Sequence, residues 1–76
     1  MPQFNAELIE VMRNALEAVM TRVPTEHSTS AIKVYLAEFI LKAADQGQTR
    51  HHELVAAATG QIQVAISLFE QAGSGI

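Results

Sequence analysis

Apolar residues recur at helical spacing through three stretches of the chain, separated by short polar segments. At about 100° per residue, positions three and four apart share a face. Asn5 predicts the N-cap of the first helix, with Phe4 and Ile9 packed as a hydrophobic staple, and Pro24 predicts that the helix ends before it. The apolar face of this helix consists of Leu8, Met12, Ala15, Leu16 and Val19.

The second stretch, residues 30–46, is apolar around most of its circumference. Ser28, Thr29 and Ser30 are all competent N-caps, and Gly47 predicts the C-terminal stop. One face of this helix is made of Ile32, Tyr35, Leu36, Phe39 and Ala43. A second, nearly opposite face is made of Val34, Ala37 and Leu41. A helix that is hydrophobic nearly all round is expected to be buried, and a chain of 76 residues has few elements to cover it. The pattern therefore predicts a partner.

The third stretch follows Thr49, which predicts the N-cap of the last helix. Its apolar positions keep one phase across Thr59 and Gly60: Leu54, Ala58, Ile62, Ala65 and Phe69. Because glycine inside a helix costs only about 1 kcal/mol, we favour one long helix to about Ala72. The alternative is a helix broken near Gly60.

Composition describes one small domain over residues 1–76. Charged residues make up 17% and apolar residues 49% of the chain, whereas about 25% charge is typical. The net charge is −3 and the five basic residues are dispersed, so no basic patch is available for nucleic acid or anionic lipid. The chain has no cysteine, no signal-peptide pattern and no apolar run long enough to span a membrane. We expect a cytoplasmic protein without a cofactor.

Residues 30–58 resemble a group of short, uncharacterised bacterial proteins. The resemblance lies in a helix of the form A-x-x-I-L-x-A-A-x-x-G followed by a polar turn, a leucine and an alanine run. The matching positions are Ala37, Ile40, Leu41, Ala43, Ala44, Gly47, Leu54, Ala56, Ala57 and Ala58. The chain departs from that pattern at residues 49–52, where an acidic residue and a proline would be expected. The resemblance covers under half of the chain; it implies an all-helical fold and no activity.

His51, His52 and Glu53 form the one cluster that suggests chemistry. Adjacent histidines on a helix point about 100° apart, whereas zinc-binding helices place them four apart. His27 could approach as a third ligand, but we favour a solvated first turn and predict no metal site. The acidic residues lie on helix faces that we expect to be exposed to solvent. Lys42 follows Glu38 by four positions, which predicts a salt bridge between these two side chains. We predict no catalytic residues and expect that the protein is not an enzyme.

The stretch from Ala44 through Gly47 into the next helix also faintly resembles a helix-turn-helix. The second helix of such a unit presents basic and amide side chains to DNA. Here it would present Arg50, His51, His52 and Gln61 on an otherwise acidic chain. A small DNA-binding or regulatory helical protein is therefore the alternative function.

The predicted fold is all-α, a three-helix up-down-up bundle with the second helix at its centre, and we expect it to be dimeric. The leading function is a small, non-catalytic protein–protein interaction module that self-associates or binds a partner helix. The residues predicted to form the interface are Val34, Ala37, Leu41, Val64 and Leu68.

Overall fold

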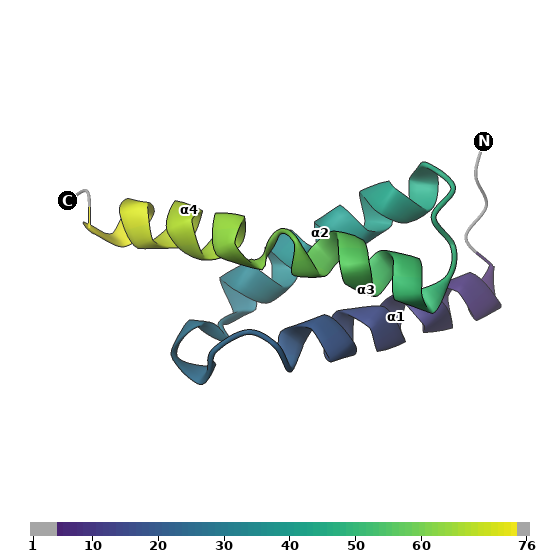
Figure 1. The fold of residues 1–76 in the computed structure, drawn as a ribbon, viewed down its shortest axis with the longest axis horizontal. Coiled ribbons are helices and arrows are strands. Elements are labelled where there is room, and N and C mark those ends of the chain that lie inside the picture. Colours follow the sequence, from purple (N-terminus) through teal and green to yellow (C-terminus); the bar gives the residue numbers. More distant parts are fainter. Residues whose placement is uncertain (1–4, 75–76) are drawn as a thin grey trace.

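The chain folds into an all-α bundle whose helices run up, down and up again (Figure 1). The structure is a computed structural model; it describes the backbone of residues 5–74 and the side chains of residues 5–70. Its helices are α1 (Ala6–Met20), the short 3₁₀ helix η1 (Thr25–His27), α2 (Ser30–Asp45), α3 (His51–Thr59) and α4 (Ile62–Ser74). The up-down-up prediction is confirmed, with α3 and α4 together forming the third arm. No helix in the described part of the chain is long and apolar enough to cross a membrane.

The predicted start of α1 and the predicted start and end of α2 are confirmed by their caps, whereas α1 already ends at Met20, before Pro24 is reached. Asn5 Oδ1 accepts a hydrogen bond from the Leu8 N–H over 2.8 Å, and Thr29 Oγ1 accepts one from the Ile32 N–H over 3.3 Å. Gly47 takes a φ of 102°, which is the left-handed conformation predicted for the residue after α2. The other half of the expected staple, Phe4, lies outside the described residues.

The N-cap of α3 differs from the prediction. Arg50, and not Thr49, occupies the N-cap position, and its backbone N–H donates to Glu53 Oε1 over 3.3 Å. A carboxylate at the third helical position can accept from the N-cap N–H, as half of a capping box. The helix therefore starts one residue later than the threonine side chain suggested.

The third arm bends by 38° near Gly60. The Gly60 N–H donates to the Ala56 carbonyl over 3.2 Å, but the Gln61 N–H donates to the Ala58 carbonyl over 2.9 Å. This change from a four-residue to a three-residue hydrogen bond tightens one turn, which bends the helix. The structure therefore combines the two alternatives: regular helix is interrupted at Gly60 and Gln61, but α3 and α4 continue one another as a single bent helix. The apolar positions before and after the bend nevertheless stay on the buried side of the arm: Leu54, Ala58, Ile62 and Ala65 are all buried.

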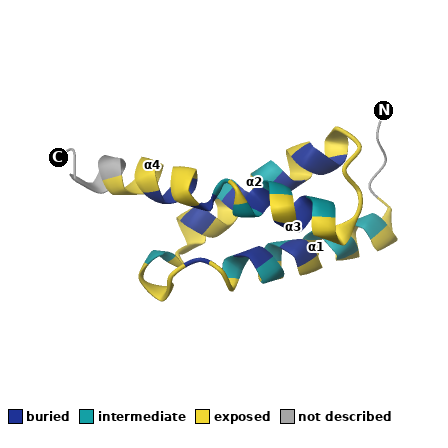
Figure 2. Ribbon diagram, in the orientation of Figure 1, coloured by how far each residue is buried: buried dark blue, intermediate teal, exposed yellow. Residues whose placement is uncertain are grey.

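The core lies between α1, α2 and α3 and extends along α2 to the first turns of α4 (Figure 2). α2 contacts α1, α3 and α4, but α1 and α3 also contact each other extensively, so the three arms pack mutually and the predicted central place of α2 is not observed. Its buried side is Ile32, Leu36, Ile40, Ala43 and Ala44. Tyr35 and Phe39, predicted for this side, are only half-buried. The buried direction on α2 is therefore rotated toward Ile40.

Phe69 is a second correction to the predicted core. Its side chain is 41% exposed, although it shares the phase of the buried positions in α4. The Phe69 ring meets the Tyr35 ring of α2 edge-on, with centroids 6.4 Å apart. Phe69 thus lies at the edge of the core and is available to a surface site.

Candidate interaction surface

The residues predicted for the interface stay largely uncovered within the chain. The exposed fractions are 57% for Val34, 43% for Leu41, 45% for Val64 and 50% for Leu68. Ala37 is half-buried. We call these five residues the outer face. Four of the six large apolar side chains that are exposed in residues 5–70 belong to it, and the other two are Ile9 and Phe69.

A shallow groove runs between α2 and α4 beside Val34. It encloses about 500 Å³ and is walled by Val34, Tyr35 and Glu38 on α2 and by Phe69 on α4. Phe69 is a site residue that sequence reasoning missed, because its phase placed it with the core. The groove brings an apolar residue of α4 next to the outer face of α2.

A second apolar groove lies on the opposite flank of α2, against α1. It encloses about 270 Å³ and is lined by Ile9, Met12, Arg13, Leu16, Ala37 and Ile40. Ile9 at its rim is 43% exposed. Ala37 belongs to both this groove and the outer face, because its small side chain leaves the space between the helices open. Sequence periodicity could not indicate the groove, which depends on how α1 packs against α2.

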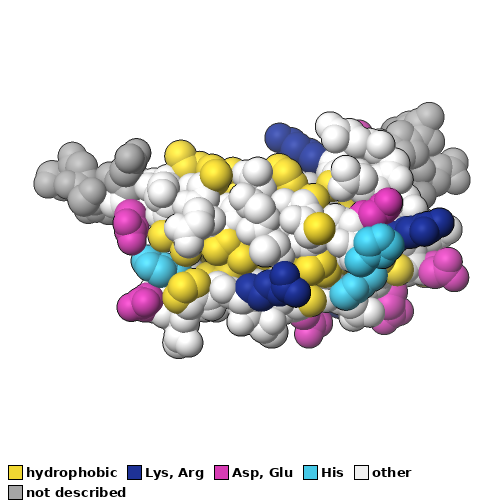
Figure 3. All heavy atoms as spheres, viewed as in Figure 1, with side chains coloured by type: hydrophobic (Ala, Val, Ile, Leu, Met, Phe, Trp, Pro, Cys, Tyr) yellow, Lys and Arg dark blue, Asp and Glu magenta, His cyan; other side chains and the backbone are white. Residues whose placement is uncertain are grey.

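Hydrophobic side chains reach the surface in the view of Figure 3 along the upper edge over α4 and in a band between α4 and α1. A histidine patch lies at the end of the molecule where α3 begins, next to a basic group, while other basic groups are spread over the view. The apolar surface and the imidazole cluster are therefore separate parts of the protein.

The histidines do not assemble as the sequence allowed. His51 and His52 are exposed in the first turn of α3, and the Glu53 carboxylate accepts a hydrogen bond from the Arg50 backbone N–H. His27 lies in η1, at the other end of the molecule (Figure 1), where its Nε2 is 3.6 Å from Glu70 Oε2. The idea of His27 as a third ligand is therefore wrong. Within the described residues, no three His, Cys, Asp or Glu side chains come close enough to hold a metal ion.

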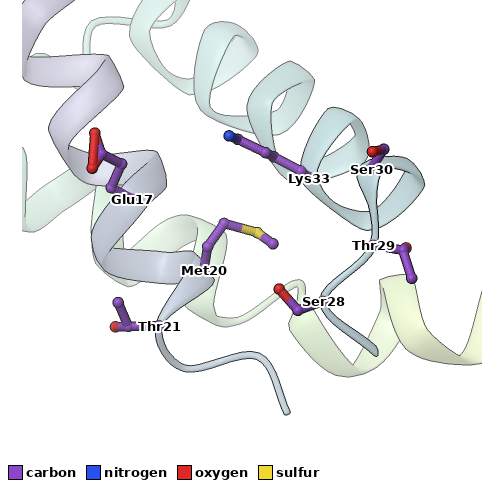
Figure 4. Close-up of a pocket in the computed structure, with 7 residues that line it drawn as sticks. All are labelled: Glu17, Met20, Thr21, Ser28, Thr29, Ser30 and Lys33. Atoms are coloured by element: carbon purple, nitrogen blue, oxygen red, sulfur yellow. The ribbon is translucent and has the colours of Figure 1, made fainter. Parts of the chain in front are cut away.

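A polar hollow of about 360 Å³ lies between the end of α1 and the start of α2 (Figure 4). Lys33 extends from α2 toward α1 across this hollow. Two of the hydroxyls that line the hollow already serve the backbone: Thr21 Oγ1 donates to the Ala18 carbonyl over 2.6 Å, and Thr29 Oγ1 caps α2. Thr21 and Thr29 therefore stabilise helix ends beside the hollow.

Charge is confined to the surface in the part of the chain with described side chains. Every buried side chain there is apolar. The predicted Glu38–Lys42 salt bridge does not form, since among residues 5–70 the one contact of a carboxylate with a basic side chain within 4.0 Å is that of Glu70 with the His27 imidazole. Glu38 and Lys42 therefore both remain available beside the outer face.

Comparison of the chain with protein-family models, with curated proteins and with solved structures found no match. The resemblance to short bacterial proteins is supported only at the level of a small all-helical protein.

Proposed function

We propose that this protein is a small, non-catalytic interaction module that binds another protein surface through the outer face of α2 and α4. One observation carries the proposal: Val34, Leu41, Val64 and Leu68 are each at least two-fifths exposed in a chain of 76 residues. Exposed apolar patches on small proteins mark interaction surfaces. The grooves on both flanks of α2 supply recesses for apolar side chains of a bound partner.

The absence of buried polar groups in residues 5–70 supports a binding role over an enzymatic one. Catalytic acids, bases and nucleophiles are activated by burial and by charged neighbours. An apolar surface instead provides binding energy by removal from water, at roughly 25 cal/mol per Å². Burial of the outer face in a complex would supply that energy.

The test uses Leu41→Glu, with Ala56→Glu on the exposed side of α3 as its matched control. Both variants add one negative charge to an exposed helical position. Light scattering on a sizing column, over a hundredfold concentration range, measures self-association. We expect a dimer near twice 8.3 kDa for the wild type and for Ala56→Glu, and a monomer for Leu41→Glu.

If the wild type is monomeric, the same three proteins serve as immobilised baits in a cell extract. Retention of one protein by the wild type and Ala56→Glu, and its loss with Leu41→Glu, supports the proposal. The proposal is wrong if the wild type is monomeric and the three baits retain the same proteins.

A further inference from the structure

Two opposite charges lie on one flank of the outer face of α2. At about 100° per residue, Glu38 lies about 60° and Lys42 about 100° around the helix from Leu41, on the same side. Both are exposed and neither takes part in an ion pair within the described side chains. This flank therefore carries one negative and one positive side chain, and neither forms a salt bridge with another described side chain of the same chain.

The other flank of the outer face is apolar and recessed. Ala37 lies about 40° from Leu41 on that side and forms part of the 270 Å³ groove against α1. Leu41 itself projects beside this recess with 43% of its surface exposed. The surface of α2 thus combines a projecting apolar side chain, a neighbouring recess and a pair of opposite charges.

We propose that the occupant of this surface is a second copy of the same chain, bound with the two α2 helices antiparallel about a two-fold axis that meets the outer face at the level of Ile40 along α2. This inference rests on the proposed function and names its partner. In an antiparallel pair related by a two-fold axis, like flanks of the helices face each other. Glu38 and Lys42 lie two residues before and two residues after Ile40. Glu38 of each copy therefore faces Lys42 of the other.

The apolar residues fit the same register. Leu41 lies next to the axis, so it meets Leu41 of the second copy and covers the recess at that copy's Ala37. Two-fold dimers require one surface to complement itself, and the charges of Glu38 and Lys42 meet that requirement in this register. A parallel pairing about a two-fold axis would instead bring unlike flanks together. Glu38 and Lys42 would then face the apolar recess at Ala37 of the other copy, away from any opposite charge, which is unfavourable.

Charge reversal tests the register. In Glu38→Lys alone, and in Lys42→Glu alone, both intermolecular ion pairs become like-charge contacts. An equimolar mixture of the two variants restores attraction at both contacts, because one chain then carries two lysines at these positions and the other carries two glutamates. Glu10→Lys, on the wet side of α1, is the control for the charge change in Glu38→Lys.

The measurement is the dimer dissociation constant by sedimentation velocity at low salt, with circular dichroism to confirm the helical fold of each variant. We expect each single variant to dissociate at about tenfold higher concentration or more, the mixture to return to the wild-type constant, and Glu10→Lys to match the wild type.

Two results would overturn the inference. A wild-type dimer that both charge reversals leave unchanged would mean that association uses another register or another face, while the proposed function stands. A wild type that stays monomeric over the whole concentration range excludes the second copy as occupant. The bait comparison with Leu41→Glu then decides the proposed function separately.

Discussion

The hydroxyl of Tyr35 donates a hydrogen bond to Gln61 Oε1 over 3.3 Å and thereby joins the middle of α2 to the bend that precedes α4. The same ring meets Phe69 edge-on, at an interplanar angle of 89°. Tyr35 therefore contacts the third arm at two points: at Gln61, just before α4, and at Phe69, within α4. Because α4 packs mainly on α2, these contacts contribute to the direction that α4 takes after the bend.

Tyr35→Phe removes the hydrogen bond and keeps the aromatic contact. We expect the free energy of unfolding to fall by about 0.5–1.5 kcal/mol, the usual net value of such a bond. Urea unfolding measures it, and Gln61→Ala provides the double-mutant cycle. If Tyr35→Phe costs as much in the Gln61→Ala background as in the wild type, the hydrogen bond is not the source of the loss.

The two internal glycines should respond in opposite directions to alanine. Gly60 has a φ of −65°, and an added Cβ would meet the Ala57 carbonyl oxygen at an ordinary 3.5 Å. Gly60→Ala should therefore stabilise the protein by about 0.4–1 kcal/mol, because it restricts the unfolded chain.

Gly47 has a φ of 102° with open space around the added Cβ. Gly47→Ala should destabilise by about 1–2 kcal/mol through backbone strain alone. Thermal unfolding of both variants measures the difference. Equal melting temperatures for the two variants would contradict the conformations assigned to these residues.

The N-cap of α1 depends on the side chain of one residue. Asn5→Ala removes the acceptor that lies 2.8 Å from the Leu8 N–H and should cost about 1 kcal/mol. Asn5→Asp and Asn5→Ser should retain most of the stability, because both supply a capping oxygen. Chemical denaturation of the three variants checks this, and a loss of equal size in all three would assign the effect to something other than capping.

Two leucines of α2, five residues apart, should tolerate charge very differently. Leu36 is fully buried, so Leu36→Glu should prevent folding by placing an unpaired charge in the core. Leu41 is 43% exposed, so a dilute sample of Leu41→Glu should keep the wild-type circular dichroism spectrum. An unfolded Leu41→Glu variant would show that this residue belongs to the core and not to the outer face.

The sequence was sufficient to predict the local structure of the first two helices. Asn5, Thr29 and Gly47 act on backbone groups within a few residues of themselves, so their effect can be read without knowledge of the fold. The cap of α3 was misassigned by one residue, since the choice between Thr49 and Arg50 depended on where Glu53 directs its carboxylate. The apolar outer face, including Val34 and Leu41, was also visible in the periodicity.

Tertiary structure alone decided which of the apolar sides of α2 is buried. Helical periodicity determines how residues are spaced around the axis, but a helix that is apolar nearly all round has no preferred inward direction of its own. The packing of α1 and α3 selected Ile40 and Ala44 over Tyr35 and Phe39. The bend at Gly60 carried Phe69 to the edge of the core. These outcomes depend on neighbours distant in sequence, which no local pattern specifies.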